Sequence, residues 1–298
     1  MEIPTSLKKL YRHWKYHTIA TINPIPKDTI YINISEFVKE RISIWKKKTL
    51  KENPTYTKDP ILGTYRFCNI FREFDKQTIE FHTILNPIRD DFPLWLLNMF
   101  YFRMVARIET VKELGLLSFD KKENEKFYKK FTALKRPKFG TPYVFPISTI
   151  MRSKTPTREL FITEYLPSIM KDIAKEISTW KKVSVYDGVS IILPKFKYNL
   201  HFLWTEVLID VAYQYPEYLD LYKRFPIGPG SKPTMMSIDS KKDPTELVVE
   251  LSKIGFDIGL TFENKPIRLS AENWEGIGCE FRKYTNLKAG RGRRRLYK

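Results

Sequence analysis

The chain has 298 residues, a formal net charge of +18 and 42% hydrophobic residues, which is ample for the core of one large domain or two small ones. Its two cysteines, Cys68 and Cys279, exclude a disulfide framework and a metal site built from cysteines alone, so we expect a reducing compartment. Residues 1–17 lack the apolar segment of a secretory signal. We therefore expect a cytoplasmic protein, in the host cell if the chain is viral.

The positive charge indicates a polyanionic partner. A protein with this charge attracts long polyphosphates, and the binding weakens as salt is added. The alternatives are a basic protein that is merely soluble and one that meets acidic lipids. We favour nucleic acid and expect no membrane insertion, because the most apolar run, residues 92–102, is too short to span a bilayer.

The pattern along the chain predicts a mainly α fold. Residues 1–58 are expected to form a basic N-terminal extension, with minor β structure at 29–34 and a helix over 35–48. Residues 59–298 are expected to form a helical catalytic domain. A division of that domain into two lobes stays open near 136–156, where prolines interrupt the pattern. Helices are expected at 157–181 with a kink at Pro167, at 199–215 and at 244–255.

The first candidate site is the stretch from Arg66 to Thr78. Gly63 and Thr64 predict the start of a helix that buries one stripe of aromatic and aliphatic residues. On this helix Arg66, Asn69 and Glu73 would share the opposite face. A solvated helix face and an inward-facing polar site explain the pattern equally well, although asparagine inside a helix usually needs a partner.

A second candidate is the apolar helix after Asp91, which contains Asn98 and Arg103. Asp91 is placed to cap this helix, and Pro93 suits its first turn. A polar group inside such a helix must find a hydrogen-bond partner. The pattern favours core struts that hold neighbouring helices, and the alternative is that Arg103 reaches a phosphate.

The third candidate is the turn at Pro226–Gly230, which contains Gly228 and Gly230 and is followed by Ser231 and Lys232. Its backbone N–H groups are expected to be exposed and to bind a phosphate, as in helix-hairpin-helix DNA-binding proteins. The C-terminal stretch adds Glu280 and Lys283, then a basic tail that includes Arg291, Arg293 and Arg294. We expect this tail to contact DNA.

Metal and nucleotide sites are not expected. His13 and His17 are four residues apart, but no carboxylate lies beside them in the sequence to complete a metal site. The chain has no Walker A loop and no dinucleotide-binding glycine motif. We therefore predict no metal and no cofactor. Carboxylates and basic groups, among them Glu73, Asp75 and Glu280, remain for catalysis.

The motifs occur in an order that resembles a known family. Arg66–Asp75, the helix with Asn98 and Arg103, the Gly228–Lys232 turn and the Cys279–Tyr284 block resemble the α-glutamyl/putrescinyl thymine pyrophosphorylase group. That group is related to the helical domain of 5-hydroxymethyluracil DNA kinases from phages. The resemblance implies a DNA-glycosylase-like helical fold. It also implies transfer of an amino acid or amine onto pyrophosphorylated 5-hydroxymethyluracil in DNA, with loss of pyrophosphate.

The chemistry of such a transfer suggests a role for each candidate. Arginines stabilise the charge that develops on a leaving pyrophosphate, and a carboxylate takes the proton of the incoming amine. We expect the pyrophosphate and substrate to be held by Arg66, Asn69, Arg72, Asn98, Arg103 and Lys283. Asn69 would read the edge of the uracil, and Glu73 or Glu280, with Asp75 nearby, would supply the base.

The expected partners are double-stranded DNA with modified uracil and an amino acid or polyamine, and the protein is expected to be a monomer. Two alternatives differ in class. One is a glycosylase-like enzyme that acts on bases, and the other is a DNA-binding partner of a separate kinase without catalysis of its own. The nucleoside products would distinguish them, since they are free base, an amino-linked nucleoside or neither.

Overall fold

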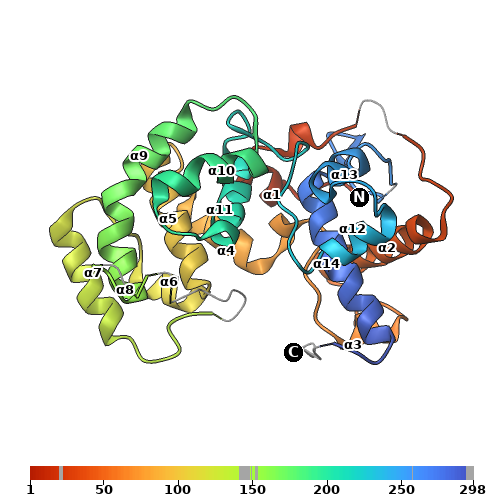
Figure 1. Cartoon of the computed structure of the whole chain (residues 1–298). Helices are drawn as coiled ribbons and strands as arrows, with labels where there is room; N and C mark the ends of the chain where they lie inside the picture. The colour runs from red at the N-terminus through yellow and green to blue at the C-terminus, as the bar shows by residue number, and fades with distance from the viewer. Residues whose placement is uncertain (20–22, 141–147, 149, 152–153, 257, 293–298) are drawn as a thin grey trace. The chain divides into compact units, whose positions relative to one another are not determined.

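The computed structural model confirms a mainly α protein, with helices throughout and four strands of two residues each among the residues described. It describes residues 1–298 except 20–22, 141–147, 149, 152–153, 257 and 293–298 (Figure 1). The chain divides into two compact units. Unit 1 comprises Met1–Asp75 and Leu221–Lys298, and unit 2 comprises Lys76–Asp220.

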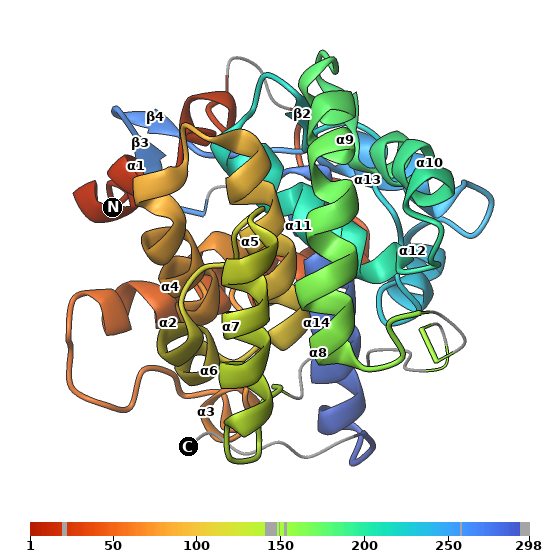
Figure 2. The same ribbon diagram turned by 90° about the vertical axis from the view of Figure 1, so that its left-hand side faces the viewer.

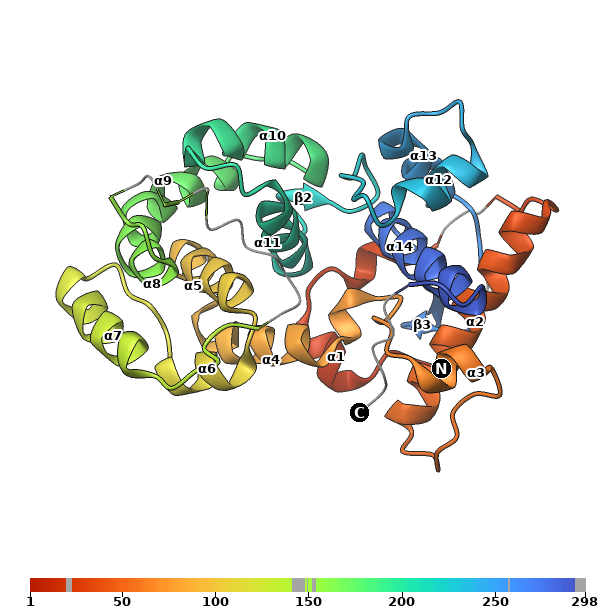
Figure 3. The same cartoon turned by 60° about the horizontal axis from the view of Figure 1, so that its bottom comes forward.

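Unit 1 is built around its last helix, α14 (Ala271–Lys288), which packs against α2, α3, α12 and α13 (Figure 3). The capping box of Ser270 and Asn273 starts α14 and satisfies backbone groups at its first turn. The other elements of unit 1 are α1 (Thr5–Leu10), η1 (Trp14–Tyr16), α2 (Thr29–Thr49), α3 (Pro60–Thr64), η2 (Arg72–Phe74), α12 (Lys232–Ile238), α13 (Pro244–Leu251), β3 (Thr261–Phe262) and β4 (Lys265–Pro266).

Unit 2 is a helical bundle in which α5 (Phe92–Val105) is almost entirely buried. It packs against α4, α9 and α11, and Figure 2 shows α5 beside α9. The other elements are α4 (Lys76–Leu85), η3 (Asn86–Ile88), α6 (Ile108–Leu114), α7 (Lys121–Ala133), α8 (Arg158–Leu160), η5 (Phe161–Tyr165), α9 (Leu166–Ser178), β1 (Val183–Ser184), α10 (Val185–Phe196), α11 (His201–Gln214) and β2 (Leu219–Asp220). The two strands pair in parallel, with Val183 opposite Leu219.

These divisions differ from the predicted ones. The N-terminal residues, expected to be an extension, belong to the same compact unit as the C-terminal helix α14, and the chain changes unit after Asp75 and Asp220. Both crossings are close to short irregular segments, whereas the proline-rich stretch 136–156 lies inside unit 2. The proline-rich stretch, part of which lies outside the described residues, is therefore not a boundary between units.

The prediction of β structure at 29–34 is wrong, because these residues form the start of α2. The stretch is rich in β-branched residues, but α2 buries Ile34, Phe37, Val38 and Ile42 on one face. Packing of this face in the core outweighs the weak intrinsic preference of β-branched residues for strands.

The prediction of a helix beginning at Gly63–Thr64 is also wrong. The helix α3 begins at Pro60, where the Asp59 side chain accepts hydrogen bonds from two backbone N–H groups, and it ends at Thr64. The stretch that follows is irregular up to the short 3-10 helix η2. Phe67, Ile70, Phe71 and Phe74 are nevertheless buried, as the pattern of apolar residues indicated.

Three other predicted helices are confirmed with small shifts, at Phe92–Val105, His201–Gln214 and Pro244–Leu251. The predicted kink at Pro167 takes the form of a π-helical turn, Phe161–Tyr165, directly before α9. Proline has no N–H to donate, and such a turn accommodates the missing bond. No helix among the described residues has the length and apolar character needed to cross a membrane.

The polar residues of α5 hold neighbouring segments of unit 2 together. Asn98 donates from Nδ2 to the carbonyl of Leu117 (3.1 Å) and accepts the N–H of the same residue (2.7 Å). Arg103 donates from Nε and Nη2 to the two carboxylate oxygens of Asp210, at 2.6 and 2.7 Å. These contacts favour the interpretation of both residues as core struts.

The buried ion pair between Arg103 and Asp210 predicts that a single substitution will strongly lower the stability of the protein. Asp210→Asn removes the negative charge beside Arg103, whose side chain is only 2% exposed. Loss of one partner of a buried ion pair costs about 3–5 kcal/mol. Urea unfolding followed by circular dichroism should show this loss, whereas Glu123→Gln, which breaks an exposed pair with Lys126, should cost less than about 1 kcal/mol. Equal losses of unfolding free energy in the two variants would contradict the interpretation of Arg103 as a core strut.

Candidate functional site

The segment from Asp59 to Asp75 is attached to α14 along its length. The Tyr284 hydroxyl donates to Asp59 Oδ2 (2.6 Å), and Lys283 Nζ donates to the carbonyl of Arg66. Further on, Glu280 Oε2 accepts the backbone N–H of Cys68 (3.0 Å). The backbone of this segment therefore bonds to side chains of α14, which explains why it does not continue as a helix.

Arg41, a buried arginine of α2, also donates a hydrogen bond to the backbone of this segment. Its Nη2 donates to the carbonyl of Cys68 (3.0 Å), and the residue is 4% exposed. Burial lowers the pKa of Arg41, and the nearby carboxylates of Glu280 and Asp75 act in the opposite direction. Nε and Nη1 of Arg41 have no hydrogen-bond partner within the part of the chain that the structure describes. The site thus contains a buried positive charge with two donors that these residues leave unused.

Four predicted site residues, Asn69, Asp75, Glu280 and Lys283, lie on this segment and on α14. Asn69 is held by Asp75, whose Oδ1 accepts both its backbone N–H (3.1 Å) and its Nδ2 (2.9 Å). Glu280 and Lys283 are one turn apart on α14, with Nζ and Oε2 at 3.5 Å. All four residues are partly exposed. The structure therefore combines two carboxylates, an amide and an ammonium group in one region of unit 1.

The pKa values of the two thiols of this region are raised, which disfavours the thiolate form. Burial, reinforced by the carboxylates of Glu280 and Glu275, raises the pKa of Cys279 to about 11. Burial also raises the pKa of Cys68 well above its usual value, again with Glu280 as the first neighbouring charge. Since the thiolate is the reactive form, the chemistry of the region falls to its carboxylates and cations.

The glycine turn is packed tightly against α14 and is not an open phosphate loop. The N–H of Gly228 donates to Glu275 Oε1 (3.2 Å), and those of Ser231 and Lys232 donate to the carbonyl of Gly228. Ser231 is fully buried, so the predicted contact of its side chain with DNA is not supported by this structure. Lys232 is exposed and remains available to a phosphate.

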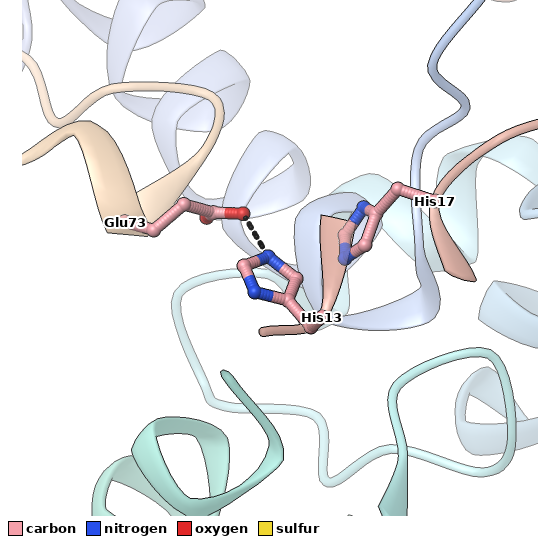
Figure 4. Close-up of side chains that lie close together, drawn as sticks. All are labelled: His13, His17 and Glu73. Carbon is pink, nitrogen blue, oxygen red and sulfur yellow. Dashed lines mark hydrogen bonds and ion pairs between the residues drawn. The ribbon is translucent and has the colours of Figure 1, made fainter. Parts of the chain in front are cut away.

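Glu73 is placed differently from the other predicted carboxylates. Its side chain is 0% exposed, and Oε1 lies 2.9 Å from Nε2 of His13, which is 2% exposed (Figure 4). The ring of His17 lies 4.5 Å from that of His13, centroid to centroid. Burial, with the charge of His13 second, lowers the pKa of His17 to about 3, so its ring is neutral at neutral pH. Although no carboxylate lies beside the two histidines in the sequence, the fold therefore brings Glu73 to them.

The remaining candidates are scattered. Arg66 is exposed and Arg72 is partly buried, both on the segment described above, whereas Asn98 and Arg103 belong to the core of unit 2. Arg291 is exposed just beyond α14. Arg293 and Arg294 lie outside the described residues.

Sequence reasoning missed Arg41, His13 and His17 as members of polar clusters. All three come from the first 58 residues, which were expected to form a separate extension. One signal was present, because Arg41 falls among the apolar positions of its predicted amphipathic helix. The approach of Glu73 to the histidines depends on a contact between residues 60 positions apart, which no local pattern shows.

Comparison with known families identifies the chain. A family model described as the helical domain of 5-hmdU DNA kinase matches residues 28–293. The chain belongs to this family. The matched range includes Arg41 and every described candidate of the region around α14, while His13 and His17 precede it.

One characterised relative is the 5-hmdU DNA kinase of Bacillus phage SP10. The chain is 30% identical to it over 95 residues, which are 30% of this chain and 14% of that kinase. The aligned stretch is thus a small part of the kinase. No solved structure matches the chain.

The packing of the glycine turn on α14 is testable with two glycines of that helix. A Cβ at Gly278 would lie 2.2 Å from Ser231 Oγ and 2.6 Å from Met235 Cε, whereas a Cβ at Gly276 would meet nothing within 4 Å. Gly278→Ala should therefore destabilise the protein by about 1–3 kcal/mol. Gly276→Ala should stabilise it by about 0.5–1 kcal/mol. Thermal unfolding measures both, and equal effects would show that the turn does not press on α14.

Proposed function

We propose that the protein modifies thymine-derived bases in DNA by transferring an amino acid or amine onto 5-(pyrophosphoryloxymethyl)uracil with release of pyrophosphate. The observation that carries the proposal is that Asp75 and Glu280, both partly exposed and both close enough to Arg41 to act on its pKa, lie beside Asn69 and Lys283, respectively. Carboxylates can accept a proton from an amine, and the amide can read a base edge.

Family membership supports this chemistry. The relative in phage SP10 is named a 5-hmdU DNA kinase, and phosphorylation of 5-hydroxymethyluracil produces the class of activated base that a transferase would consume. The net charge of +18 favours DNA as the polymer that carries the base. Exposed Lys232 and Arg291 are placed in the same unit as the carboxylates and would contact phosphates of the backbone.

The reaction breaks one bond and forms one. The C–O bond between the 5-methylene carbon and the pyrophosphate breaks, and the pyrophosphate leaves with the electron pair. The amine nitrogen forms a bond to the same carbon and gives up a proton to Asp75 or Glu280. The reacting methylene sits at the edge of a stacked pyrimidine, so the base has to be flipped out of the duplex, as in the glycosylase-like fold that the family resemblance implied.

The cations near the carboxylates would stabilise the leaving group. Lys283 and the exposed Arg66 lie at the surface of the region, and Arg72 belongs to the same segment. Arg41 adds a buried positive charge, and its attraction for the leaving pyrophosphate would be screened less than that of a surface group. Arg103 is omitted from this set because Asp210 holds its guanidinium, and Glu73 is omitted as the base because its carboxylate faces His13.

The test uses a duplex that carries 5-(pyrophosphoryloxymethyl)uracil, a mixture of amino acids and polyamines, and mass analysis of the digested nucleosides. We expect a new amino-linked nucleoside with the wild-type protein. Asp75→Asn or Glu280→Gln should lower its rate of formation about 10²–10⁴-fold. Glu52→Gln, an exposed change three residues beyond the end of α2, should leave the rate unchanged.

Other products would contradict the proposal in different ways. Release of free base would identify a glycosylase-like enzyme. Duplex binding without any product would identify a non-catalytic DNA-binding partner of a kinase. Wild-type rates in both carboxylate variants would show that the chemistry takes place elsewhere.

A further inference from the structure

We propose that His13, His17 and Glu73 form a binding site for a divalent transition-metal ion of the zinc type. One ligand atom from each of the three residues can be chosen so that all lie within 4.8 Å of one another, and all three residues are buried (Figure 4). The site is distinct from the partly exposed carboxylates around α14, and it is independent of the transfer reaction proposed above.

The spacing of the donors suits a small ion. Histidine nitrogens and carboxylate oxygens lie about 2.0–2.2 Å from zinc, so the donors of a tetrahedral site are about 3.4 Å apart. The contact between His13 Nε2 and Glu73 Oε1 is 2.9 Å, slightly shorter than that separation. A longer His13–Glu73 distance and a closer approach of His17, whose donor lies within 4.8 Å of the other two, would give the three donors this spacing.

The donor types select the class of ion. Two imidazoles and one carboxylate are the three protein ligands of many zinc sites that keep a fourth position for water. Nitrogen donors suit zinc and its neighbours in the first transition series, whereas magnesium prefers oxygen donors and near-octahedral geometry. The set therefore favours Zn²⁺ over Mg²⁺.

The surroundings hold the ligands in position. His13 and His17 flank the short helix η1, and the backbone N–H of Arg268 donates to the carbonyl of His17 (2.8 Å). The Tyr11 hydroxyl donates to the carbonyl of Glu73 (2.9 Å). Both contacts fix the main chain on either side of the cluster, as the outer contacts of metal sites do.

Aromatic rings pack around the cluster. Trp14 is 1% exposed, and its ring centroid lies 4.6 Å from that of His13. The ring centroid of Tyr222 lies 5.4 Å from that of His17. Neither ring nitrogen of His17 has a hydrogen-bond partner of good geometry among the described residues. A phenylalanine would fill the same space without the cost of burying an imidazole, so packing alone does not account for histidine at this position.

A metal ion bound here would link two parts of unit 1 that are far apart in the sequence. The N-terminal turn at 13–17 would be bound directly to the segment that carries Asn69 and Asp75, since Glu73 is two residues before Asp75. Binding energy from the ion would then add to the stability of the folded unit.

The experiment loads the full-length protein with Co²⁺ alone, Zn²⁺ alone or Mg²⁺ alone and removes excess ion by dialysis. We expect about one equivalent of retained zinc, visible d–d absorption with cobalt and a rise of the melting temperature with both ions. Mg²⁺ should produce no shift. His17→Phe keeps the packing but removes one donor, and Glu73→Gln removes the carboxylate. Each variant should retain less than about a tenth of the wild-type zinc.

His201→Gln is the matched control, because His201 is exposed on α11 in the other unit and should leave zinc retention unchanged. Circular dichroism establishes that each variant is folded, and the wild-type measurements stand even if a variant is not. The proposal is overturned if the wild-type protein retains no zinc, or if folded His17→Phe retains as much as the wild type.

Discussion

The arrangement of unit 1 depends on the attachment of the Asp59–Asp75 segment to helix α14. This segment is irregular over most of its length, so its backbone groups need partners from outside. Side chains of α14 and Arg41 of α2 provide them. Because the same side chains also supply the charges of the candidate site, the contacts that hold the segment are inseparable from those that place Asn69 and Asp75.

Helix α14 also meets the turn at 228–231, and glycine occurs there because the two approach each other closely. The turn approaches α14 so closely that a Cβ at Gly230 would lie 2.6 Å from Cys279 Sγ. The sequence suggested a phosphate-binding loop there, since Gly-Pro-Gly with a following lysine has that composition. In the folded protein the glycines allow the backbone of the turn to pack closely against α14. Lys232 is exposed, as predicted.

Much of the fold was predictable because long apolar helices carry a strong periodic signal, as α5 and α11 show. The irregular structure of residues 65–75 could not be predicted, because the spacing of their buried phenylalanines and isoleucine also fits a helix. Whether the predicted residues form a site stays a prediction; within it, Asn69 bonds to Asp75 and Lys283 lies beside Glu280. The His13–Glu73 contact could not be found, since it depends on tertiary packing between distant stretches. For Arg41 the sequence contained a signal of burial but none of its partner, the carbonyl of Cys68.

The most direct test of the central claim compares the affinity of the protein for two duplexes that differ at one base. One carries 5-(pyrophosphoryloxymethyl)uracil and the other thymine, and fluorescence anisotropy measures both at one salt concentration. A site that holds the pyrophosphate should bind the modified duplex at least about tenfold more tightly, because a charge-assisted contact contributes about 1.5–3 kcal/mol. Lys283→Met should abolish the difference, while Lys288→Met, an exposed change on the same helix, should preserve it. Equal affinity of the wild-type protein for both duplexes would contradict the account.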